Sequence, residues 1–124
     1  MPYTVRHDAE LDLIEVTVRG SISGSDIRGV STDYIDLQKR TGSLRILVDA
    51  NESELDASMM EIYALPEKQY KEEGLDRRTR IAVILPTSAS TRQGALFYET
   101  ICQNRGWDAR VLPDRQSAID WLKN

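Results

Sequence analysis

The sequence predicts a single α/β domain built around a mixed sheet of about five strands. The chain has 124 residues, of which 40% are hydrophobic and 29% charged, as in an ordinary globular domain with its own core. Short apolar segments alternate along it with amphipathic segments of helical period. No internal repeat, low-complexity tract or linker divides the chain. We therefore expect one domain over residues 1–124, with its elements in the order ββαβαβαβα.

Two extended segments open the chain, over residues 3–8 and 11–19. In the second, Ile14, Val16 and Val18 alternate with polar residues, which is typical of a strand with one buried face. We expect the two segments to form an antiparallel hairpin.

An amphipathic helix is expected after the hairpin. Ser23 offers an N-cap, and Asp26 follows at the third helical position, where an acidic side chain favours a helix start. Apolar residues then recur every three or four positions as far as Gly42, which is expected to end the helix. These residues are Ile27, Val30, Tyr34 and Leu37.

The next predicted elements are a central strand and the helix that follows it. Residues 44–49 are apolar apart from Arg45 and the final aspartate, as expected for a central parallel strand. A short acidic loop and a helix that opens at residues 56–58 are expected to follow. Pro66 lacks a backbone donor, so we expect a kink or break there and a second short helix to about Glu73.

The last third of the chain predicts two more strand and helix pairs. Residues 80–85 are a nearly continuous apolar strand, and Ser90 with Gln93 has the spacing of a capping box for the next helix. Residues 109–112 form the last expected strand. Asp114 is expected to cap a final helix that packs back on the sheet.

Composition narrows the classes of function. The formal net charge of −4 argues against a nucleic-acid partner, which would require clustered lysine and arginine. Cys102 is the only cysteine, so the chain forms no internal disulfide, and we expect a cytoplasmic protein without a transmembrane segment. The hairpin leaves a sheet edge unpaired, and we expect a symmetric homodimer to form there.

A family likeness lies in residues 46–65, ILVDANESELDASMMEIYAL, taken with the expected element order. Together they resemble the anti-sigma-factor antagonists and related STAS domains, in which a strand ending in aspartate leads to an Asp-Ser-Ser-Gly helix start. The whole chain is similar to small bacterial proteins described as SpoIIAA-like or STAS/SEC14-like, above all over residues 109–122. The resemblance implies a regulatory module that binds a protein partner or a small apolar, lipid-like ligand.

The same resemblance implies that Ser58 is a phosphoacceptor beside a matching Asp56. Ala57 and Met59 depart from the family pattern, which has serine and glycine at these two positions. The alternative interpretation is structural, because capping chemistry explains both polar residues, with Asp56 as the N-cap and Ser58 in the first turn.

A second candidate site is a hydroxyl-rich turn before the helix that starts near residue 90. A helix N-terminus at the carboxyl end of a parallel strand suits an anion, and the Asp49–Ser58 loop is expected at the same edge of the sheet. A turn with an ordinary N-cap is the alternative. The residues of this second site are Thr87, Ser88, Ser90, Thr91 and Arg92.

The function classes that remain are binding and carboxylate-based catalysis. A lipid-like ligand would need an apolar cavity, for which Met59, Tyr63 and their neighbours Met60 and Tyr70 are candidate lining residues or plain core. An enzyme would depend on Asp49 or Asp56, because the chain has a single histidine and no nucleotide-binding motif. We expect no catalytic residue, metal or cofactor, and therefore a non-catalytic module.

Overall fold

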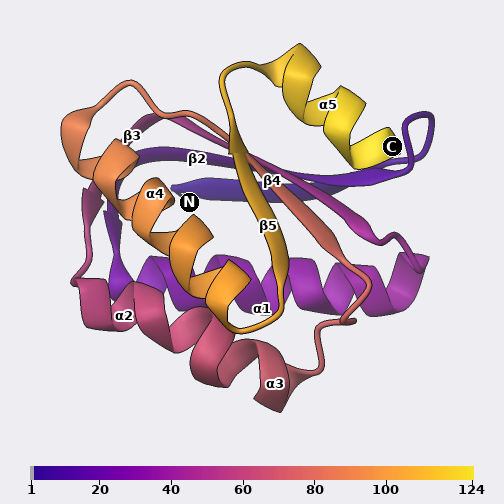
Figure 1. Ribbon diagram of the computed structural model, residues 1–124, viewed down its shortest axis with the longest axis horizontal. Helices are drawn as coiled ribbons and strands as arrows, with labels where there is room; N and C mark the ends of the chain where they lie inside the picture. The colour runs from indigo at the N-terminus through magenta and orange to yellow at the C-terminus, as the bar shows by residue number, and fades with distance from the viewer. Residues whose placement is uncertain (1) are drawn as a thin grey trace.

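The computed structural model describes residues 2–124 and contains one five-stranded mixed sheet (Figure 1). Its strands lie in the order β1-β2-β3-β4-β5, with β1 antiparallel to β2 and the remaining neighbours parallel. The expected α/β class, hairpin and strand number are therefore confirmed. The strands are β1 (Tyr3–Asp8), β2 (Leu13–Ser23), β3 (Arg45–Asp56), β4 (Arg80–Ile84) and β5 (Asp108–Leu112).

The helices cover the two faces of the sheet unequally (Figure 1). One face carries every helical segment except the last, and α5 alone packs on the other. This follows from three successive parallel crossovers of one hand, each of which returns its helix to the same face. The helical segments are α1 (Gly24–Thr41), α2 (Met59–Ala64), the π-helical turn η1 (Leu65–Gln69), α3 (Tyr70–Glu73), α4 (Ala89–Asn104) and α5 (Arg115–Lys123).

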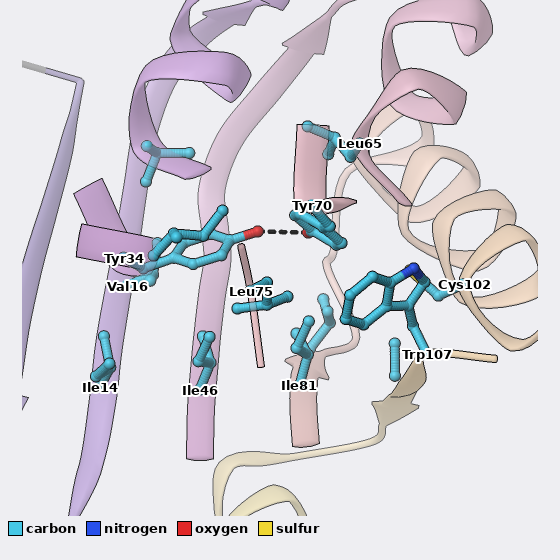
Figure 2. Packing of buried hydrophobic residues seen from close by; sticks show 14 of the residues in the cluster. Ile14, Val16, Tyr34, Ile46, Leu65, Tyr70, Leu75, Ile81, Cys102 and Trp107 are labelled. Carbon is cyan, nitrogen blue, oxygen red and sulfur yellow. Dashed lines mark hydrogen bonds between the residues drawn. The ribbon is translucent and has the colours of Figure 1, made fainter. Parts of the chain in front are cut away.

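The main core lies between the sheet and the larger helical layer. Tyr70 is fully buried there, and its ring makes edge-to-face contacts with Tyr34 and with Trp107 (Figure 2). Cys102 is buried in the same cluster, as expected for an apolar filler residue. A smaller cluster, which includes Leu47 and Leu122, packs beneath α5.

The helix break expected at Pro66 is confirmed. The α-helix ends at Ala64, and the chain continues as the π-helical turn η1 before α3 resumes. Proline donates no backbone hydrogen bond, and a wider turn accommodates it. The Pro66 carbonyl accepts a bond of 3.2 Å from Trp107 Nε1, which fixes the break against the core.

Strands β2 and β3 both extend further than the sequence predicts. β3 does not end at Asp49, and residues 50–56 continue the strand where an acidic loop was expected. The pairing with β2 shifts at Ala50 and Asn51, which together lie opposite the single residue Val18, and then resumes to the end of both strands. The bulge escaped prediction because it interrupts the regular alternation without ending the pairing.

The expected end of β2 was also wrong for a local reason. The sequence predicts a strand that stops at residue 19, but Gly20 adopts a φ of 71° inside the strand, which runs on to Ser23. Only glycine takes this left-handed conformation at little cost.

Two of the four expected helix starts need correction. Ser58 is the N-cap of α2, whereas Asp56 was the expected cap and is the last residue of β3. Ser88 is the N-cap of α4, two residues before the expected Ser90. Ser23 with Asp26, and Asp114, cap α1 and α5 as expected. Both errors arose where several polar residues precede one helix, because each of them has capping chemistry.

Strand β1 forms one edge of the sheet, so the expected homodimer through this edge stays a prediction. Within residues 2–124, no helix combines the length and the apolar character needed to cross a membrane.

A buried charge joins the start of α5 to the sheet. Glu15 on β2 is buried, and its carboxylate accepts hydrogen bonds of 2.9 and 3.0 Å from the Arg115 guanidinium. Arg6 on β1 adds a longer bond of 3.3 Å. The hydrogen bonds from Arg115 lower the pKa of Glu15, although burial alone would raise it.

Replacing Arg115 by alanine is expected to lower the free energy of unfolding by about 1–3 kcal/mol near neutral pH, because it leaves a buried carboxylate without its bidentate partner. Arg6→Ala is the matched control, with an expected loss below about 1 kcal/mol, since the Arg6 side chain is 64% exposed. Urea unfolding measures both values, and equal losses would contradict the prediction.

The contribution of Glu15 to the free energy of unfolding should depend on pH. Glu15 has a folded pKa below its ordinary value of 4.5, so its contribution is present above that value and is lost as the pH falls through the folded pKa. The stability difference between the parent and Arg115→Ala should therefore shrink in acid, which urea unfolding at pH values on both sides of the ordinary pKa would measure.

Candidate functional site

A cavity of about 140 Å³ lies between the sheet and the larger helical layer. Strands β1 to β4 contribute to one wall, and α1, α2, η1, α3 and α4 contribute to the other. Its accessible wall is almost entirely apolar. The lining residues are Tyr3, Val16, Val18, Ile22, Asp26, Ile27, Val30, Ser31, Tyr34, Val48, Ala50, Ser53, Leu55, Ile62, Leu65, Tyr70, Val83, Pro86, Thr91, Gly94, Ala95 and Tyr98.

The cavity exists because the central strand presents small side chains to the helical layer. Val48 lies in the middle of β3 yet is only partly buried, and Ala50 follows it at the bulge. Gly94 allows α4 to approach the end of β3, since a Cβ atom there would lie 2.3 Å from Leu55 Cδ2. The helices therefore touch the end of the strand and leave its middle uncovered.

Three tyrosines from three helical segments meet at the cavity. The Tyr70 hydroxyl bonds to the Tyr34 hydroxyl on α1 and, at 2.6 Å, to the Tyr98 hydroxyl on α4 (Figure 2 shows the first of these contacts). Burial raises the pKa of Tyr34 to about 12 and raises those of Tyr70 and Tyr98 well above the ordinary value. All three hydroxyl groups are therefore protonated near neutral pH.

The hydroxyl-rich turn and the segment after Asp49 come together, as expected for two connections at one edge of the sheet. The Thr87 hydroxyl donates to the Asn51 carbonyl at 3.3 Å, and the Ser90 hydroxyl donates to the Glu54 carboxylate at 3.0 Å. These bonds attach the turn to the part of β3 that extends past β4.

The other predicted residues of this turn also bond within the protein. Ser88 accepts a bond from the Thr91 backbone N–H as the N-cap, and the Arg92 guanidinium donates to the Pro86 carbonyl at 3.2 Å. The five residues predicted as an anion site thus hold the turn and β3 together, and no anion is needed to explain their positions.

Ser58 lies on the surface at the start of α2. Its hydroxyl accepts the Glu61 backbone N–H at 3.1 Å, and the Glu61 carboxylate accepts the Ser58 backbone N–H at 3.0 Å. This second bond is the main reason that the pKa of Glu61 is lowered. Met59 and Met60, which follow, are 44% and 74% exposed.

The side chains proposed for an apolar cavity divide into two groups. Tyr70 lines the cavity, whereas Met59 and Met60 are exposed and Tyr63 bonds through its hydroxyl to the Arg105 guanidinium. Helical spacing predicts Met59, Tyr63 and Tyr70 on one stripe, but the π-helical turn rotates the chain between Tyr63 and Tyr70.

The two carboxylates proposed for catalysis do not converge. Asp49 accepts a bond from the Asn51 backbone N–H and lies on the α5 side of the sheet, near Arg115. Asp56 is exposed at the far end of the same strand, roughly 20 Å away at the rise of an extended chain. Among residues 2–124, no three His, Cys, Asp or Glu side chains are grouped to hold a metal ion.

Sequence reasoning missed two of the three cavity tyrosines as site residues. Tyr34 was recognised only as one member of an apolar stripe, and Tyr98 was not singled out. The available signal was the residue type itself, because a tyrosine on the buried side of a helix needs a partner for its hydroxyl group.

No family model and no curated protein sequence matches the chain. Several solved structures, in contrast, superpose on it. An anti-sigma factor antagonist from Mycobacterium paratuberculosis superposes with a TM-score of 0.66 at 13% identity, over 98% of this chain and 95% of that one. An uncharacterized protein with a SpoIIAA-like fold from Shewanella loihica gives 0.60 at 15% identity, over 97% and 93%.

The anti-sigma factor antagonist SpoIIAA in its unphosphorylated form gives a TM-score of 0.57 at 9% identity, over 98% of both chains. All three structures match this chain over nearly its whole length. At sequence identities this low, the similarity supports a shared fold and no more. The chain therefore has the SpoIIAA-like fold that its sequence resembles.

Proposed function

We propose that this protein is a non-catalytic binding module that holds a small apolar molecule in the cavity between β3 and the helices α1, α2 and α4. The cavity itself is the observation that carries the proposal. At about 140 Å³ it is close to the roughly 150 Å³ at which an apolar protein cavity takes up benzene. It is smaller than the roughly 300–1,000 Å³ of drug-sized sites, so the ligand is a single ring or a short chain.

The energetic cost of the empty space supports a role in binding. The cavity is partly open, so its apolar wall stays in contact with water, which is unfavourable relative to a filled core. Replacing Ala95 by a larger apolar residue would remove much of this cost. A bound apolar molecule recovers it in the same way.

The proposed module is regulatory. Two of the structures with this fold are described as anti-sigma factor antagonists. Ile62 lines the cavity from α2, whose first turn carries the exposed Met59 and Met60. Occupancy of the cavity can therefore alter the surface that α2 presents to a protein partner.

Toluene is the probe for the cavity, and it is expected to raise the Tm of the parent protein in a concentration-dependent way. Ala95→Leu should abolish the rise, because the new side chain fills the cavity. Gln93→Leu is the matched control, since it places the same residue on the exposed face of the same helix, and it should respond like the parent. Differential scanning calorimetry measures all three, and a parent that does not respond to toluene would refute the proposal.

A second candidate function is a phosphorylation switch at Ser58, which its exposure and the two exposed methionines beside it favour. SpoIIAA, which has the same fold, is described in an unphosphorylated form. A phosphate on Ser58 would stand at a helix N-terminus, where negative charge is favourable. It would also face the Glu61 carboxylate, whose partner Arg28 lies at 3.6 Å.

Ser58→Asp is expected to keep the free energy of unfolding within roughly 1 kcal/mol of the parent, because aspartate is also a good N-cap. Ser58→Ala should lose about 0.5–2 kcal/mol, since the Glu61 backbone N–H loses its acceptor. Urea unfolding measures both. The switch further requires phosphate on Ser58 of the native protein and a different set of partners for Ser58→Asp in pull-downs. Native protein without phosphate, together with identical partner sets, would leave Ser58 as a cap alone.

A further inference from the structure

The polar side chains of the cavity wall bond within the protein. The Thr91 hydroxyl donates to the Ser53 carbonyl at 2.9 Å and accepts a bond from the Ser88 hydroxyl at 2.9 Å. The Ser53 hydroxyl donates to the Ala50 carbonyl at 2.7 Å. Each of these hydroxyl groups thus donates its hydrogen to a protein oxygen atom and has none left to donate to a ligand.

The tyrosine hydroxyl groups are engaged in the same way. Tyr70 bonds to Tyr34 and to Tyr98. The accessible wall of the cavity is almost entirely carbon, so these oxygen atoms present very little surface to a ligand. A hydroxyl group on a ligand would therefore meet almost no accessible polar surface in this wall.

The charge on the wall excludes anions. None of the described residues that line the cavity is a lysine, an arginine or a histidine. The one carboxylate, that of Asp26, accepts bonds from the Ser23 backbone N–H and hydroxyl at 3.0 and 3.1 Å. A ligand carboxylate would enter an apolar space with no counter-charge and with a like charge in its wall, which is strongly unfavourable.

We infer that the ligand is uncharged and that its buried part is a plain hydrocarbon, an aromatic ring or short alkyl chain of about the size of benzene. The cavity discriminates against phenols, alcohols and carboxylates of the same size. This inference rests on the proposed function and names the class of ligand. Its physical basis is the cost of burying a hydroxyl group without a partner, which corresponds to roughly a five- to hundredfold loss of affinity.

Toluene and phenol form the decisive pair, because they have the same shape and differ by a methyl group against a hydroxyl group. Titration of the parent protein, followed by the NMR signals of the methyl groups that line the cavity, should show toluene binding at least about tenfold more tightly than phenol. Benzoate should not bind. Phenol or benzoate binding as tightly as toluene would overturn this inference and leave the proposed function standing. Failure of all three probes to bind would overturn both.

A single substitution tests whether the selection arises in the cavity. Val48→Thr adds a hydroxyl group to the cavity wall at the middle of β3 with little change of shape, and it should reduce the preference for toluene by at least about threefold. Val5→Thr is the matched control, because Val5 lies on β1 outside the cavity wall. An unchanged preference in Val48→Thr, or an equal change in both variants, would overturn the inference.

Discussion

The parallel pairing of β2 with β3 is the constraint on which the rest of the structure depends. The two strands pair from Ile14 with Ile46 to Ser23 with Asp56, across a bulge, and so reach well beyond the point at which β4 stops pairing with β3. Helix α1 starts directly after β2, and α2 starts after β3 with two residues between them. The length of this pair therefore sets where both helices begin.

The two helix starts are held against each other closely. The Glu61 carboxylate caps α2 and lies over Gly24, where a Cβ atom would stand 1.5 Å from its oxygen. The edge of β3 that β4 leaves unpaired accepts hydrogen bonds from the Thr87 hydroxyl, in the turn before α4, and from the Thr91 hydroxyl, in the first turn of α4. Three connections from different parts of the sequence thus meet at one strand extension.

The cavity is a consequence of this arrangement. The helices are fixed at one end by the strand extension and over the core by the tyrosine hydroxyl chain, which joins α1, α3 and α4. Buried hydrogen bonds in a low-dielectric core are directional and costly to break, so the helices do not collapse onto the small side chains of Val48 and Ala50. Contacts that keep the core open take the place of the dense packing that fills most protein interiors.

Local chemistry in the sequence determined the fold class, the hairpin, the caps at Ser23 and Asp114 and the break at Pro66, because period, capping and proline effects act within a few residues. The sequence likewise predicted that the turn before α4 and the segment after Asp49 meet. Only the tertiary structure decided that β3 continues through a bulge, that Ser58 replaces Asp56 as the cap, and that Met59 and Met60 face outward. The cavity, too, was decided only by the tertiary structure. Its size depends on the distance between the helices and the sheet, and long-range contacts set that distance, which no local sequence pattern encodes.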